Sequence, residues 1–359
     1  MKTEKKREEK RENKRDDKRK NIREDKRKNK IAYILYGIIG ILLMAGFILT
    51  GTYGLSEVNK KAYDSFAAES SYMSKLGFKD FYAADDTVRF FDGEKDYVVK
   101  SNGEITREKK VLDVLAATAW KVGEEYQILV PVYENMSGFT KMAENVEMIT
   151  SSGENDNQTS KSAFSGESDS QTSKATFSEE FYVAAICHEA FHVWQFNHFE
   201  EQINRELGEI KADREEVITS EIDSNSEYVN SIEQEVKLLF EAYYETDMKK
   251  KLKLVGLAME EEDKRRSTMN ENSRRVEYYI ENLEGSAQYV EAMVYKDLTS
   301  QKEFEDYYLE EFTYVNGSYK YYTIGLMKCL ILDQMDESLQ EKFTYENGLS
   351  QIMKGIEQK

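Results

Sequence analysis

The stretch His188-Glu189-Ala190-Phe191-His192 contains two imidazoles four residues apart and a carboxylate beside the first. On an α-helix, residues four apart lie on the same side, so both imidazoles can bind one metal ion. Glu189 points to a different side and can hold a water molecule next to that ion. This spacing is typical of a catalytic Zn²⁺ site in which the acid is the general base. We therefore predict that His188 and His192 are metal ligands and that Glu189 is catalytic.

The residues around this motif predict the helix that it needs. Ser178 followed by Glu179 and Glu180 has the pattern of an N-cap with acids in the first helical turn. The flanking residues 181–194 are mainly apolar and compatible with a helix, which indicates that the helix is buried.

A catalytic zinc site needs a third protein ligand, and two residues compete for that place. His198 follows His192 at the spacing of the metzincin peptidases, which it resembles, except that Gln195 stands where their motif has glycine. Glycine permits the turn that brings the last histidine back to the metal. If the helix continues through Gln195, His198 points away from the site. Glu284 is therefore the preferred ligand, and Glu281, one turn upstream, is the spare candidate.

The segment 284–291 (EGSAQYVE) resembles the EGxAxYxE segment of gluzincin peptidases, especially the aminopeptidase-N-like family. The leading Glu of that segment is a zinc ligand in the family, so the resemblance implies the same role for Glu284. It also implies that Gly285 and Ala287 let a second helix approach the motif helix closely. Two features depart from the family pattern: Leu283 replaces an Asn, and the gap after His192 is much longer.

The same family has a Tyr three residues before a Gly on a later helix, and that Tyr stabilises the oxyanion. The segment Tyr322-Thr323-Ile324-Gly325 is similar, so the resemblance implies a catalytic Tyr322. Tyr319 and Tyr321 are the neighbours that a shift in register would favour. The likeness to gluzincins, both aminopeptidase-N-like and thermolysin-like, rests on three short motifs within about 178–335.

The N-terminal part predicts a membrane anchor. Residues 31–53 carry no charge and are long enough to cross a bilayer as a helix. Residues 1–30 hold 16 Lys and Arg against 8 Asp and Glu, which predicts a cytoplasmic N-terminus and an extracellular catalytic domain in the cell membrane. The formal net charge of −18 for the whole chain argues against a nucleic-acid partner.

Between the anchor and the motif helix, the pattern predicts strands. The stretch 87–99 has the pattern of a hairpin around Asp92-Gly93. The stretch 126–133 has the pattern of a buried or edge strand, and Pro131 favours a place at the sheet edge. The stretch 111–122 is compatible with helix or strand, and 54–76 has the pattern of a short helical stalk.

We therefore predict an α+β fold with an N-terminal transmembrane helix, a small mixed sheet and a mainly helical zincin-like catalytic domain. The expected parts are listed in chain order: a charged cytoplasmic segment 1–30, a transmembrane helix 31–53, a stalk and small sheet subdomain 54–149, a flexible Ser/Thr-rich loop 150–177, and a helical metallopeptidase-like domain 178–359 with a charged helical insert 200–270.

These features predict a membrane-anchored extracytoplasmic zinc metallopeptidase acting on a peptide or protein substrate, with endo- and exopeptidase activity both open. The alternative is a non-enzymatic, membrane-tethered helical interaction protein with a structural metal site. The two cysteines, Cys187 and Cys329, leave two possibilities: a disulfide bridge or two buried thiols.

Overall fold

The computed structural model describes residues 54–138, 177–209, 212–309, 316–335 and 342–357. Within these residues, a five-stranded mixed sheet is followed by a mainly helical remainder, so the expected α+β class is confirmed. The segments 1–30 and 31–53, for which we predicted a charged tail and a transmembrane helix, lie outside the described residues, as do residues 150–176 of the predicted flexible loop 150–177. In the described part, no helix has the length and apolar character to cross a bilayer.

The sheet has the strand order β3-β2-β1-β5-β4, with β1 parallel to β5 and its other neighbouring pairs antiparallel. The strands are β1 (Val88–Phe91), β2 (Lys95–Val99), β3 (Ile105–Lys109), β4 (Thr118–Val122) and β5 (Glu125–Pro131). The predicted hairpin is confirmed as β1 and β2. Its turn is closed by Asp92, whose side chain accepts the N–H groups of Glu94 and Lys95, and Gly93 adopts φ +104°. Of the two possibilities for 111–122, its last residues form strand β4.

The prediction that Pro131 marks an edge strand is wrong. Strand β5 lies inside the sheet, between β1 and β4. Strand β4 pairs only with the first part of β5, from Glu125 to Leu129, so Pro131 lies beyond the end of that ladder. A proline is tolerated there because no partner strand requires its missing N–H. The free edge on this side of the sheet belongs to β4.

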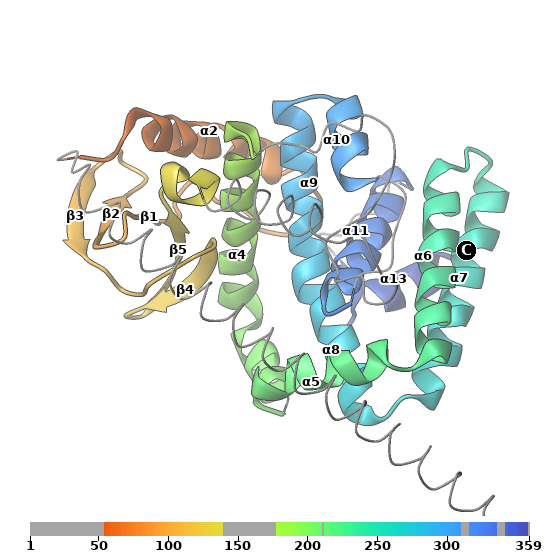
Figure 1. Cartoon of the computed structure of the whole chain (residues 1–359). Helices are drawn as coiled ribbons and strands as arrows, with labels where there is room; N and C mark the ends of the chain where they lie inside the picture. The colour runs from red at the N-terminus through yellow and green to blue at the C-terminus, as the bar shows by residue number, and fades with distance from the viewer. Residues whose placement is uncertain (1–53, 139–176, 210–211, 310–315, 336–341, 358–359) are drawn as a thin grey trace, which may run out of the picture. The chain divides into compact units, whose positions relative to one another are not determined.

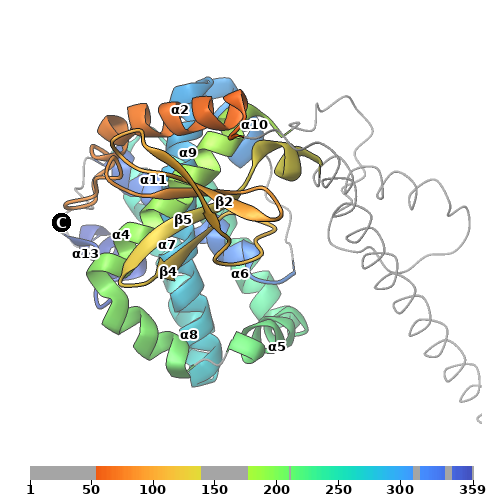
Figure 2. The same cartoon turned by 90° about the vertical axis from the view of Figure 1, so that its left-hand side faces the viewer.

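Helix α4 (Glu179–Glu209), which contains the motif, lies between the sheet and the remaining helices (Figures 1 and 2). Tyr182 in its first turn ties it to two other elements. The hydroxyl of Tyr182 lies 2.8 Å from the carbonyl oxygen of Pro131 on β5 and 3.0 Å from Oδ1 of Asn59. Asn59 belongs to α2 (Glu57–Met73), the helix expected in 54–76, and α2 buries six residues against the fold.

An aromatic cluster fixes the rotation of α4 about its axis. Phe191 and Trp194 pack against Phe78 and Phe81, with ring centroids 4.5 Å apart for Phe78 and Phe191 and 6.0 Å apart for Phe81 and Trp194. The indole N–H of Trp194 donates to the carbonyl oxygen of Lys79. Burying these aromatic rings is strongly favourable, so this side of α4 is held inward. His188 and His192 therefore face another side.

Opposite α4 lies a continuous run of helix: α8 (Glu271–Ile280), the π-helical turn η1 (Glu281–Gly285) and α9 (Ser286–Leu298). Helix α11 (Tyr319–Gln334) packs behind it and is buried along almost its whole length. A Cβ atom built on Gly285 would lie 2.5 Å from the Cα atom of Gly325 on α11. The close helix approach expected at Gly285 is thus present, but its partner is α11 rather than the motif helix.

The expected charged insert 200–270 comprises the end of α4 and three helices, α5 (Ala212–Asp223), α6 (Ser226–Tyr244) and α7 (Met248–Thr268). Helices α6 and α7 lie side by side and cover the outer side of α11 together with α13 (Leu349–Glu357) (Figure 1). Helix α10 (Gln301–Tyr308) packs against α9. Among the described residues of this region, four charged side chains are buried: Glu235, Lys251, Glu262 and Arg265.

Four side chains of this region and three from α8, η1 and α11 form what we call the buried charge cluster: Glu235, Glu262, Arg265, Arg266, Glu277, Glu281 and Lys328. Lys328 is completely buried, and its Nζ lies 2.6 Å from Glu262, 2.9 Å from Glu281 and 3.2 Å from Glu235. Arg265 binds Glu277 through two nitrogens, each at 3.0 Å. Because each charge faces an opposite one, the cluster can exist away from water.

Removal of one cation from the cluster leaves buried carboxylates without a partner. We expect Lys328→Met to lower the free energy of unfolding by about 3–5 kcal/mol, as measured by urea denaturation. The matched control is Lys354→Met, which breaks the exposed ion pair with Asp263 and is expected to change the stability by less than about 1 kcal/mol. Equal effects of the two substitutions would contradict this account of the cluster.

Candidate metal centre

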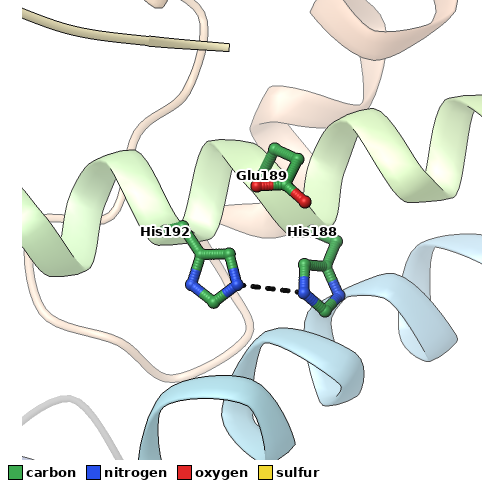
Figure 3. Close-up of side chains that lie close together, drawn as sticks. All are labelled: His188, Glu189 and His192. Carbon is green, nitrogen blue, oxygen red and sulfur yellow. Dashed lines mark hydrogen bonds between the residues drawn. The ribbon is translucent and has the colours of Figure 1, made fainter. Parts of the chain in front are cut away.

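The site lies where α4 passes η1 and α9 in the opposite direction. His192 on α4 lies next to Glu284 in η1, and His188, one turn earlier on α4, lies next to Glu291 on α9. Figure 3 shows the two imidazoles on one side of α4 with Glu189 on another side. The segment that contains the motif and the segment that resembles the gluzincin EGxAxYxE sequence are therefore in contact, although they are far apart in the chain.

Three atoms form a compact triangle at this contact. Nε2 of His188 lies 3.0 Å from Nε2 of His192, and Oε2 of Glu284 lies 3.5 Å from the first and 3.3 Å from the second. In a tetrahedral zinc site with bonds of about 2.0–2.1 Å, neighbouring ligand atoms are about 3.3 Å apart. The two nitrogens and one carboxylate oxygen thus have both the chemistry and the separations of three ligands to one Zn²⁺ ion.

Each imidazole has a partner at its other nitrogen. Nδ1 of His188 lies 2.8 Å from Oε2 of Glu291, and the other oxygen of Glu291 accepts a hydrogen bond of 2.7 Å from the hydroxyl of Tyr308. Nδ1 of His192 lies 2.7 Å from Oε1 of Gln195. A carboxylate can only accept, so His188 carries its proton on Nδ1 and presents Nε2 to a metal.

Glu189 lies beside the triangle. One of its oxygens and the ring nitrogens of His188 and His192 all lie within 4.8 Å of one another, a wider spacing than that of the triangle with Glu284. The backbone N–H of Ala119 on β4 donates a hydrogen bond to the Glu189 carboxylate. Burial raises the pKa of Glu189, against the lowering effect of the two histidines. Such a carboxyl is well suited to accept and return a proton.

The charges of the site favour a cation. Burial opposes charge on both imidazoles, but Glu284 and Glu291 raise the pKa of His188, and Glu284 raises that of His192. Burial raises the pKa of Glu284, but the adjacent histidines outweigh this and hold it well below its usual range. Three carboxyl groups, counting Glu189, thus surround two imidazoles.

The competing ligand candidates lie elsewhere. His198 is exposed, its Nδ1 donates to the carbonyl oxygen of Trp194, and its ring lies 5.0 Å from the Trp194 ring, on the aromatic side of α4. The helix continues through Gln195 as expected and is kinked only at Phe199. Glu281 is fully buried, and its two oxygens bind Lys328 and Arg266 in the buried charge cluster.

Tyr322, the expected oxyanion group, lies on α11 one turn before Gly325, whose backbone contacts Gly285 next to Glu284. It is half-buried, and its ring stacks on that of Tyr319 with centroids 5.8 Å apart. Tyr319 is half exposed, and its hydroxyl accepts a hydrogen bond from Gln288. Tyr321 is completely buried in the core, so it is poorly placed to contact a substrate.

The two cysteines are both free and buried. The bridge between Cys187 and Cys329 that the sequence left open is therefore not formed, and the alternative of two buried thiols holds.

Gln195, Glu291 and Tyr308 are site residues that the sequence analysis missed. Glu291 closes the segment 284–291 and lies seven residues after Glu284, on the same side of the helix. That spacing alone could have placed Glu291 near the site. Gln195 follows His192 by three residues, which also places it on the side of the site. Nothing in the sequence links Tyr308 to Glu291.

No protein-family model matches the chain, and no curated protein or solved structure is significantly similar to it.

The protonation of the site predicts how zinc binding depends on pH. Because the acids raise the pKa of His188 and His192, Zn²⁺ must displace protons from them. The apparent affinity should therefore rise with pH, about tenfold per unit for each proton displaced, until both imidazoles are neutral. Competition with a chromophoric chelator between pH 5.5 and 8 measures this. His198→Gln should leave the profile unchanged, and a pH-independent affinity would refute the expectation.

Proposed function

We propose that the protein is a membrane-anchored, extracytoplasmic zinc metallopeptidase with a gluzincin-type site in a zincin-like domain. The observation that carries the proposal is the triangle of His188, His192 and Glu284, with Glu189 beside it. A purely structural metal site has no use for an adjacent buried carboxyl group. The anchor and the outside location rest on the uncharged stretch 31–53 and the basic segment before it.

Zn²⁺ held by this triangle would lower the pKa of a coordinated water towards neutrality and polarise the carbonyl of the scissile bond. Glu189 accepts a proton from the attacking water and then delivers it to the leaving amine. Tyr322 donates a hydrogen bond to the developing oxyanion without adding a formal charge. Glu291 and Gln195 hold the two imidazoles in orientation throughout.

The position of β4 supports a peptide as the substrate. Glu189 contacts the backbone of Ala119 in this strand, and β4 is the terminal strand of the sheet on that side. An extended peptide can add to such an edge through main-chain hydrogen bonds, which would bring one of its carbonyl groups close to Glu189. This mode of binding is compatible with endo- and exopeptidase activity alike.

The alternative, a non-enzymatic interaction protein that docks through 200–270, has less support. Helices α6 and α7 direct Glu235, Glu262 and Arg265 into the buried charge cluster, where these side chains are at most 2% exposed. These three charges are not accessible to a partner, so docking could use only the other, mostly exposed charged side chains of the two helices.

Glu189→Gln tests the mechanism, because it keeps the shape of the side chain and removes the base. We expect hydrolysis of a casein or peptide-library substrate to fall at least about 10³-fold, while the zinc content stays near one ion per chain. The control is Glu201→Gln, an exposed residue of the same helix, which should be fully active. Persistent hydrolysis by the Glu189 variant would refute the proposed mechanism.

Tyr322→Phe tests the oxyanion role. It should lower kcat by about 10²-fold with little change in KM or zinc content, because the hydrogen bond forms mainly in the transition state. Tyr319→Phe is the matched control, since Tyr319 stacks on Tyr322 and loses only its contact with Gln288. Steady-state kinetics of both variants decide the question. A loss confined to the Tyr319 variant would transfer the role to that residue.

A further inference from the structure

Gln195 is completely buried and contacts both ligand-bearing helices. Its Oε1 lies 2.7 Å from Nδ1 of His192 on its own helix. Its Nε2 lies 3.1 Å from the carbonyl oxygen of Leu283, 3.4 Å from that of Asn282 and 3.0 Å from Oγ of Ser286. Leu283 immediately precedes Glu284. The side chain of Gln195 therefore connects the ligand candidate His192 to the backbone beside the ligand candidate Glu284.

The orientation of the Gln195 amide follows from its partners. The carbonyl oxygens of Asn282 and Leu283 can only accept, so the NH₂ group must face them. Ser286 already donates its hydroxyl hydrogen to the carbonyl oxygen of Asn282 at 2.6 Å, so it can accept from Gln195. Oε1 is thereby left facing His192 and must accept a hydrogen bond from the N–H group at Nδ1. The lone pair of Nε2 then points to the triangle.

Among the described side chains, Gln195 is the one that hydrogen-bonds Nδ1 of His192. Leu283, at the position where the gluzincin segment has Asn, is apolar and buried in the core. A neutral amide suits the position because it accepts on one side and donates on the other.

We propose that Gln195 is a positioning residue that joins the two halves of the metal centre. It fixes the tautomer and ring orientation of His192, and it holds the turn η1 so that Glu284 reaches the same ion. The inference rests on one part of the proposed function, namely that His188, His192 and Glu284 bind Zn²⁺. It extends the motif of this chain to His188-Glu189-x-x-His192-x-x-Gln195.

Metal retention in the full-length chain tests the proposal. Gln195→Met keeps the size of the side chain and removes both functions of the amide, whereas Gln195→Glu keeps an acceptor for His192 but repels the two carbonyl oxygens. We expect both variants to release Zn²⁺ about 10–100-fold faster than the unmodified protein, with an altered absorption spectrum of the Co²⁺-substituted form. Gln288→Met is the matched control. Gln288 is also a buried glutamine one turn from a ligand, but its amide contacts Tyr319.

The outcomes separate the two ideas. If the unmodified protein retains Zn²⁺ and the Gln195 variants do so equally well, Gln195 has no positioning role and the metal site stands. Equal losses in the Gln195→Met and Gln288→Met variants would reduce the effect to packing and also overturn the proposal. An unmodified protein that binds neither Zn²⁺ nor Co²⁺ would overturn both the proposal and the proposed function.

A measurement on the unmodified protein does not depend on whether the variants fold. With 3 histidines in the chain, long-range ¹⁵N–¹H NMR of the zinc-loaded form can assign each ring. We expect the proton of His192 on Nδ1. A proton on Nε2 would overturn the proposal.

Discussion

The candidate centre depends on the backbone of η1, because this turn directs Glu284 to the histidines and Glu281 into the buried charge cluster. In an α-helix, residues three apart point only about 60° away from each other. A π turn contains more residues, so it spreads Glu281 and Glu284 further apart. Glu281 can then bind Lys328 and Arg266 while Glu284 reaches the histidines. The contact of Gly285 with Gly325 and the hydrogen bonds of Gln195 hold this turn on two further sides.

In the buried charge cluster, seven charged side chains lie inside the helical part of the protein because opposite charges face one another. Four carboxylates face three cations, and their pKa values respond differently. Burial acts to raise the pKa of Glu262 and Glu277, but the adjacent cations outweigh it and leave these pKa values lowered. Burial prevails at Glu235, whose pKa is raised. Of these three carboxyl groups, Glu235 takes up a proton most readily, and a proton there would make the charges of the cluster equal.

Local patterns predicted the parts of the structure that local physics determines. The hairpin followed from Asp92-Gly93 between β-formers, and the motif helix from its cap and its apolar face. Glu284 could be chosen because a short segment carried its context, and the structure brings it next to both histidines. Pro131 led to a wrong prediction. An inner strand accepts a proline beyond the end of its neighbouring strand, and the sequence does not show that the pairing with β4 ends at Leu129.

Contacts between distant segments could not be predicted in the same way. Charged residues on a helix usually indicate a solvated face, so Glu235, Arg265 and Lys328 gave no sign that they meet in the core. The sequence marks Gln195 only as a residue that replaces a glycine, because the acceptors of its NH₂ group lie about ninety residues further along the chain. A hydrogen-bonding role of this kind becomes visible once two helices are placed side by side.

The burial of Cys187, directly before His188, has a chemical consequence for the centre. Burial raises the pKa of this thiol and of Cys329 far above the usual value, so each remains a thiol. The thiolate is the species that oxidants attack and that competes for soft metals. The thiol of Cys187 is therefore a poor competitor for a metal ion next to the nitrogen and oxygen donors of the site. We therefore do not expect oxidants to reach the neighbouring histidines through a reaction of this thiol.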